Sequence, residues 1–218
     1  MGLGPDSLSF VNIEWVKQLY RQLKQFTDER AQELSQLGDD FPAPLELTRF
    51  YVEPCLQPYR PLPRRSGVAS PDPCQSAFSL LNSFFASGPP YRRDGSHQLI
   101  LLGEPGAGKS SFLLVIKLMQ LAGFWSKNYN CQLVTLDEHT LDRIRAMGNK
   151  EKTVLLLDAL NEDKQAQKYP LGRILTLLQA GEPFYRVIIS CRSHFFPAMI
   201  PDSTGRLRIR ALSGYNCP

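Results

Sequence analysis

The sequence is poor in the residues that build metal centres and disulfide frameworks. Its 218 residues include five cysteines and three histidines, and no CxxC pair occurs. A zinc site needs clustered ligands, so we expect no metal centre of that kind. We interpret the cysteines, which are odd in number and widely spaced, as reduced thiols of a cytosolic protein. These residues are Cys55, Cys74, Cys131, Cys191 and Cys217, with His97, His139 and His194.

Long apolar runs and a strong charge of one sign are also lacking. No stretch approaches the roughly 18 apolar residues of a membrane span, and the first residues, MGLGPDSLSF, have no basic region followed by a long apolar run. We therefore expect neither a membrane span nor a secretory signal, and a cytoplasmic location. Lys+Arg 25 against Asp+Glu 21 gives a net charge of +4. This excess is too small and too scattered to favour nucleic acid as a partner.

The first part of the chain has the pattern of a helix. Residues 11–37 carry apolar side chains mostly at intervals of three and four, with polar residues between them. This period predicts one long amphipathic helix that ends at Gly38. Two roles for its apolar face remain open, which are docking against the rest of the protein and binding a partner.

Prolines recur through the next part of the chain. They disfavour regular helix and hold the preceding residues in extended conformations, so we interpret residues 41–95 as a proline-rich connector. Within it we expect an extended segment at 47–54 and a short helix over 75–86. The sequence thus predicts three parts, namely a helical arm at 1–40, the connector at 41–95 and a main domain at 96–218.

Short apolar runs alternate with helical patterns in the main domain. This rhythm predicts an α/β fold of three layers, in which a mostly parallel five-stranded sheet is covered by helices on both faces. Ligands of such sheets bind at the carboxyl ends of the strands. The expected strands are 98–102, 132–136, 153–157, 186–190 and 206–212, and the expected helices are 109–121, 140–147 and 170–180.

A glycine-rich turn joins the first of these strands to the first helix. Its sequence GEPGAGKS, residues 103–110, fits the pattern G-x-x-x-x-G-K-[ST] of a phosphate-binding P-loop. Backbone N–H groups of such a loop face phosphate oxygens, and the helix adds its positive end. We expect Lys109 to reach the β and γ phosphates, Ser110 to ligate Mg²⁺ and Ser111 to contact the α phosphate. The nucleotide-binding residues are Gly103, Glu104, Pro105, Gly106, Ala107, Gly108, Lys109, Ser110 and Ser111.

An acidic residue ends the third strand, in TVLLLDALNED at 153–163. In a parallel sheet this position lies near the phosphate loop, so we expect Asp158 to hold the magnesium shell opposite Ser110. Glu162, slightly further along, is the candidate general base that orients an attacking water. Asp163 competes with it for that role.

An arginine follows the fourth strand, in YRVIISCRSHFFP at 185–197. The strand ends near Ser190, so Arg192 emerges at the edge of the sheet where the phosphate loop lies. It can neutralise charge on the γ phosphate. The alternative is a surface ion pair with the acidic segment 161–163.

With these three motifs in this order, the chain resembles the NACHT branch of the STAND (signal-transducing) P-loop NTPases, particularly its bacterial members. The resemblance rests on LILLGEPGAGKSSFL, KTVLLLDALNED and YRVIISCRSHFFP, and extends over residues 47–214. LLLDAL is similar to the Walker B signature of that family, and CRSHFFP resembles its sensor-arginine motif. The family usually has an aspartate where this chain has Asn161, which implies slower hydrolysis and retained binding.

The resemblance implies an ATP-controlled switch, in which Mg²⁺-dependent nucleotide binding and slow ATP hydrolysis gate oligomerisation and activate an effector in defence or signalling. Such proteins continue into winged-helix and sensor regions, so we expect this chain to be truncated after the nucleotide-binding core. The catalytic residues would be Lys109, Asp158, Glu162 and Arg192, and the metal ligands Ser110 and Asp158.

Other functions remain open. One alternative is a scaffold that binds nucleotide without hydrolysing it and acts through assembly with other chains. Another is a different P-loop ATPase or a kinase. ATP is favoured over GTP because no NKxD segment of the guanine-reading kind occurs, and GNKEK at 148–152 lacks its aspartate.

Overall fold

The structure is a computed structural model that describes residues 17, 28–41, 43–58, 75–86, 96–124, 129–195 and 208–213. The chain divides into two compact units. One comprises residues 1–53 and 114–128, and the other comprises residues 54–113 and 129–218. In the part of the chain that is described, no helix combines the length and the apolar character needed to cross a membrane.

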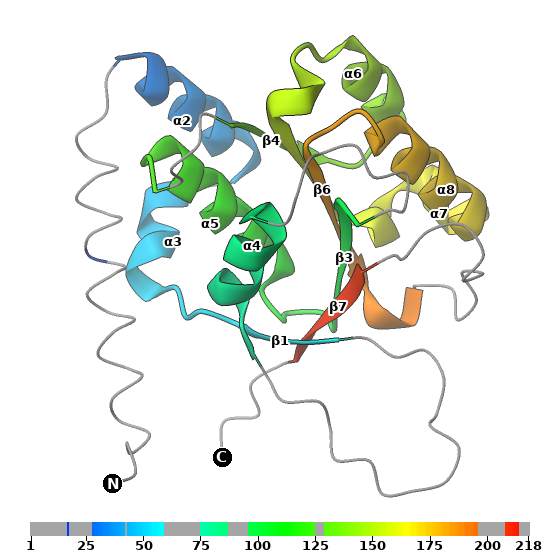
Figure 1. Ribbon diagram of the computed structural model, residues 1–218, viewed down its shortest axis with the longest axis horizontal. Helices are drawn as coiled ribbons and strands as arrows, with labels where there is room; N and C mark the ends of the chain where they lie inside the picture. Colours follow the sequence, from blue (N-terminus) through cyan, green and yellow to red (C-terminus); the bar gives the residue numbers. More distant parts are fainter. Residues whose placement is uncertain are drawn as a thin grey trace, which may run out of the picture. The chain divides into compact units, whose positions relative to one another are not determined.

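The larger unit is built on a seven-stranded sheet with the order β2-β1-β7-β3-β6-β5-β4 (Figure 1). Neighbours from β7 to β4 run parallel, whereas β1 and β2 add an antiparallel edge beside β7. The expected mostly parallel sheet is therefore confirmed, with strand ends that differ by at most two residues from those predicted. The strands are β1 Cys55–Pro58, β2 Gln75–Ser76, β3 Gln98–Gly103, β4 Asn130–Thr135, β5 Thr153–Asp158, β6 Arg186–Arg192 and β7 Arg208–Ser213.

Helices cover both faces of this sheet. All six residues of β3 and of β5 are buried, as expected of parallel strands between two helical layers. Ile100, Leu155 and Ile189 belong to the core cluster on one face, together with Ile144 of α6 and Ile174 of α8. On the other face lie α4 and the first turn of α5 (Figure 1). The helices are α4 Ala77–Ala86, α5 Lys109–Leu121, α6 Thr140–Ala146, α7 Lys164–Lys168 and α8 Pro170–Gly181.

Two side chains at the start of β6 anchor α4. The guanidinium of Arg186, which is buried, donates from Nε to the carbonyl of Phe84 at 2.8 Å. The hydroxyl of Tyr185 donates to the carbonyl of Phe85 at 2.5 Å. The last carbonyls of a helix have no partner within it, so these contacts cap α4 and hold it against the sheet.

The smaller unit contains α2 Asp28–Asp40 and α3 Pro44–Phe50. Apart from Lys17, residues 11–27 of the predicted amphipathic helix lie outside the described residues. The described part continues two residues past the expected end at Gly38. Glu33 forms an ion pair of 2.7 Å with the buried Lys117 in the second half of α5, so α2 docks on that half of the helix within this unit.

The expectation of an extended segment at 47–54 is wrong over its first half, because α3 occupies residues 44–50. Proline breaks a helix in its interior but is favoured in the first turn, where its missing N–H removes no hydrogen bond. Pro44 occupies such a position. The prolines of this region therefore mark a helix start here as well as irregular chain.

The expectation that all cysteines are reduced is also corrected. Cys55, in β1, is disulfide-bonded, while Cys131 and Cys191 are buried and form no disulfide. Sequence spacing cannot reveal such a bond, because it depends on how close two Cα atoms come in the folded chain. The cysteine pattern alone therefore does not assign this protein to a reducing compartment.

Candidate functional site

The order of the strands creates a crevice at the carboxyl ends of β3 and its neighbours. After β3 the chain crosses to the far edge of the sheet, forms β4, and returns through β5 to β6, which lies directly beside β3. After β6 it continues on the other side of β3, in β7. Ligand sites of open α/β sheets lie where the order of the strands reverses, so that successive connections lead to opposite sides of one strand. The turn after β3 is therefore in the expected place for a binding site.

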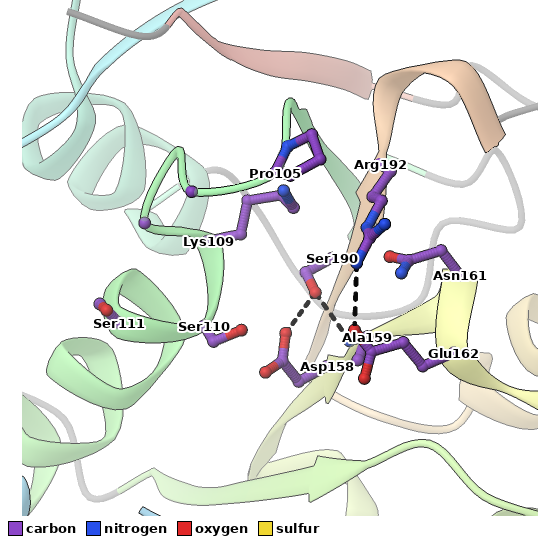
Figure 2. Close-up of a pocket in the computed structure, with 12 residues that line it drawn as sticks. Pro105, Lys109, Ser110, Ser111, Asp158, Ala159, Asn161, Glu162, Ser190 and Arg192 are labelled. Atoms are coloured by element: carbon purple, nitrogen blue, oxygen red, sulfur yellow. Dashed lines mark hydrogen bonds and ion pairs between the residues drawn. The ribbon is translucent and has the colours of Figure 1, made fainter.

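A pocket of about 320 Å³ occupies this crevice. Its volume is at the lower end of the range of small-molecule sites. The turn after β3, the start of α5 and the carboxyl ends of β5 and β6 all contribute to its wall (Figure 2). The lining residues are Pro105, Gly106, Gly108, Lys109, Ser110, Ser111, Asp158, Ala159, Asn161, Glu162, Ser190 and Arg192.

The turn has the backbone conformation that the glycine pattern predicts. Gly106 and Gly108 have positive φ angles of 79° and 78°, which side chains with a Cβ rarely adopt. The N–H of Ala107 donates to the carbonyl of Glu104 at 3.1 Å, which closes the turn, and α5 begins at Lys109. The N-terminus of a 13-residue helix thus opens at the pocket. This combination provides backbone donors and a positive dipole end for an anion.

Lys109 folds back along the same turn. Its ammonium donates to the carbonyls of Gly103 and Glu104, each at 2.9 Å. Partial burial lowers the pKa of this lysine, as does the nearby charge of Arg192, while the negative charge of Asp158 opposes the shift. A bound polyanion would stabilise the ammonium form, because it adds negative charge beside Lys109.

The strand order, the glycine turn after β3 and the helix that this turn opens together decide the fold. It is the fold of the P-loop NTPases. The loop follows a buried strand and opens a helix, as the sequence motif requires. It also shares a pocket with the acidic residue Asp158.

Asp158 lies across the pocket from the start of α5. It is the last residue of β5 and is 4 % exposed. Its carboxylate and the hydroxyl of Ser110 point toward one another across the pocket (Figure 2). These two oxygen donors fit a magnesium site in which phosphate and water supply the remaining ligands. Among the described residues no cluster of three or more His, Cys, Asp or Glu side chains occurs, so a site built by protein side chains alone is not indicated there.

Ser190 holds Asp158 and was not expected from the sequence. Its hydroxyl donates a short hydrogen bond to Oδ1 of Asp158 and accepts one from the N–H of Ala159 at 2.9 Å. Near the end of β6, the sequence analysis singled out only Arg192. The strand order would have pointed to Ser190 as well, because β6 lies between β3, which leads into the phosphate loop, and β5, which ends at Asp158.

The chain turns sharply after Asp158. Ala159 has a left-handed conformation, with φ 61° and ψ 46°, and the 3₁₀ turn Leu160–Glu162 follows it. Asn161 and Glu162 on this turn line the pocket. The left-handed alanine therefore redirects the chain so that two polar side chains face the loop.

Glu162 and Arg192 form an ion pair. Arg192 Nη2 lies 3.5 Å from Glu162 Oε1, and both side chains are partly exposed. The alternative of an ion pair with the segment 161–163 is therefore present in the structure. Both members also line the pocket, so the pair does not remove either residue from the site.

Asp163, the competitor of Glu162, has a different position. Its carboxylate caps α7 by accepting from the N–H groups of Gln165 and Ala166, and it accepts from Nε and Nη2 of Arg173 at 2.9 and 2.7 Å. Asp163 and Arg173 are 1 % and 3 % exposed. This residue is a structural ion-pair partner beside the core and is not among the pocket-lining residues.

Cys191 is adjacent to the site in sequence yet points into the core. Burial raises the pKa of its thiol to about 12, so almost no reactive thiolate forms near neutral pH. We expect Cys191 to resist iodoacetamide in the folded protein and to react once the protein is unfolded in urea. Mass spectrometry of the peptide containing Cys191 checks this, and rapid labelling of the folded chain would contradict it.

The comparisons with known proteins add little to this description. No protein-family model matches the chain, and no curated protein matches it. Among solved structures, the chain is similar to one titled "Structure of C. elegans PCH-2", with a TM-score of 0.37 and 15% sequence identity over 61% of this chain and 40% of that chain. The chain thus spans less than half the length of that structure. The strand order, the loop and the pocket of the chain itself identify its fold.

Proposed function

We propose that the pocket binds a nucleoside triphosphate, ATP, together with Mg²⁺, and that the chain hydrolyses it slowly. One observation carries the proposal. The glycine turn, the amino end of α5 and Lys109 face the buried carboxylate of Asp158 within a single pocket. Clustered N–H donors and an ammonium opposite a carboxylate suit a polyphosphate with a divalent cation between them.

The residues of the pocket have distinct roles in binding. Lys109 exchanges its two carbonyl partners for the β and γ phosphates, and the backbone around Gly106 and Gly108 donates to the phosphate oxygens. Ser110 and Asp158 would hold Mg²⁺, which supplies charge neutralisation on the phosphates. Ser111 lines the same wall, which supports its assignment to the α phosphate.

Hydrolysis is assigned to Glu162 as general base and to Arg192 as the cation that neutralises γ-phosphate charge. The ion pair between these two residues opposes both roles at once. Arg192 must leave Glu162 before it can reach the phosphate, and Glu162 is then available to the attacking water. This linkage supports slow turnover that depends on a rearrangement at the pocket.

We further propose that the chain acts as a nucleotide-controlled switch of the NACHT/STAND type, with oligomerisation and signalling as its output. The resemblance of three motifs supports this proposal, and the pocket residues that those motifs supply lie together.

A scaffold that binds ATP without hydrolysing it is the second candidate. Asn161 lines the pocket at the position where the resembling family has an acid, and Arg192 engages the candidate base. The amide at position 161 and the ion pair at Glu162 both favour weak catalysis. Neither feature affects the phosphate-binding turn.

Phosphate release from γ-labelled ATP separates the two candidates. Substitution of Glu162 by glutamine removes the base and should slow release about 100-fold or more, while ATP binding is retained. Glu151→Gln is the matched control, because Glu151 is exposed and precedes the opposite end of β5. Turnover that is equal in the wild type and in Glu162→Gln would contradict the base assignment. Binding without any turnover by the wild type would support the scaffold.

A further inference from the structure

The ladder between β5 and β6 ends just before the site. The last paired residues are Leu157 and Ile189, one residue before Asp158 and Ser190. On its other side β6 remains paired with β3 through Arg192, which is opposite Gly103. The ends of β5 and β6 are therefore not joined by ladder pairing at Asp158, whose backbone is paired only with Thr135 of β4 on its other side.

The hydroxyl of Ser190 makes this connection. It accepts from the N–H of Ala159 and donates to Oδ1 of Asp158, so one oxygen atom satisfies a backbone donor and a carboxylate. Ser190 and Asp158 are 1 % and 4 % exposed. Hydrogen bonds to a charged group are stronger than those between neutral groups, particularly away from water. The carboxylate is thus fixed in orientation by a group that belongs to a different strand.

The second bond acts on the strained turn. A left-handed conformation is unfavourable for a residue with a Cβ such as alanine, and the bond from Ala159 N–H to Ser190 helps to keep it. This turn is what brings Asn161 and Glu162 to the pocket wall. Ser190 therefore connects the orientation of Asp158 to the placement of the candidate base.

We propose that Ser190 is a positioning residue for magnesium binding and hydrolysis. Its hydroxyl engages Oδ1 of Asp158, which leaves Oδ2 to serve the metal shell opposite Ser110, and it holds the turn that carries Glu162. This inference rests on the proposed function of the pocket. A purely structural role, in which Ser190 only satisfies a buried carboxylate, would affect stability but not the metal requirement.

The test compares Ser190→Ala with Thr153→Val in the full chain. Thr153 is 1 % exposed and donates from Oγ1 to the carbonyl of Asn149 at 2.9 Å, at the opposite end of β5. Both variants lose one buried hydroxyl. Binding of a fluorescent ATP analogue is measured over a range of Mg²⁺ concentrations and in EDTA, with the melting temperature of each variant.

For Ser190→Ala we expect the half-saturating Mg²⁺ concentration to rise about 10-fold, as for other residues that orient a metal ligand, while binding in EDTA stays at the wild-type level. Thr153→Val should leave both values unchanged, and Ser190→Thr, which keeps the hydroxyl, should restore the low Mg²⁺ requirement. Backbone amide exchange at Ala159 should accelerate in Ser190→Ala, with or without nucleotide.

Three outcomes would overturn the inference. The first is an equal Mg²⁺ requirement in Ser190→Ala and Thr153→Val. The second is an equal loss of binding with and without Mg²⁺ in Ser190→Ala, which indicates structural damage alone. The third is unchanged exchange at Ala159. A wild-type chain that binds no ATP analogue would contradict the proposed function itself, and the inference with it, so the two failures can be told apart.

Discussion

Substitution of Lys109 by alanine is expected to weaken ATP binding about 100-fold or more. The ammonium would donate at least two charge-assisted hydrogen bonds to the phosphates, and losing them removes about 3 kcal/mol or more, which corresponds to that change in Kd. Lys109→Gln keeps a donor but removes the charge, so it should bind more weakly than the wild type and more tightly than Lys109→Ala. Equilibrium titration with a fluorescent ATP analogue measures all three proteins.

The control for this prediction is Lys168→Ala. Lys168 is an exposed lysine in the last turn of α7 and is not among the residues that line the pocket. The substitution Lys168→Ala removes the same charge from the chain as Lys109→Ala, so a general electrostatic effect on ATP binding would appear in both variants. Equal affinities of the wild type and Lys109→Ala would contradict the binding site as proposed.

Substitution of Asp163 by alanine is expected to lower the free energy of unfolding by about 3–5 kcal/mol, the typical loss when one member of a buried ion pair is removed. Arg173 would remain buried without its carboxylate, and α7 would lose its cap. One nitrogen of the Arg173 guanidinium, Nη1, is already buried without a hydrogen-bond partner. The surroundings therefore offer little to replace the bonds that its other nitrogens would lose. Urea denaturation monitored by circular dichroism measures the loss.

Asp142→Ala is the matched control for Asp163→Ala. Asp142 forms an ion pair with Arg145 at 3.3 Å, and both side chains are largely exposed. Such a pair contributes about 1 kcal/mol or less. The double substitution Asp163→Ala with Arg173→Met should recover part of the stability, because it removes the uncompensated charge. A loss for Asp163→Ala no larger than that for Asp142→Ala would contradict the structural role.

Local pattern was sufficient for the five strands and the three longer helices of the main domain, whereas α7 was not predicted. The apolar runs and the glycine turn predict β3, the loop and α5, because each depends on residues that are close in sequence. Asp158 and Arg192 were found for the same reason, since each follows an apolar run that ends at the carboxyl edge of the sheet. The pocket contains both.

The order of the strands could not be read from the sequence, and the missed residues follow from that. Ser190 matters because β6 lies between β3 and β5. Glu162 and Asp163 are neighbours with the same chemistry, and only the position of Arg173, ten residues later, draws one of them into the interior. The disulfide at Cys55 likewise depends on contacts between distant residues.

The two faces of strand β6 have different surroundings near its carboxyl end. Val187, Ile189 and Cys191 belong to the hydrophobic core cluster, whereas Ser190 and Arg192, at the alternate positions, line the pocket. Natural variation is therefore subject to two kinds of selection that alternate over residues 189–192, whereas Ile188 is buried like its neighbours. We expect changes at 187, 189 and 191 to lower the amount of folded protein, and changes at 190 and 192 to alter the pocket while the core stays packed.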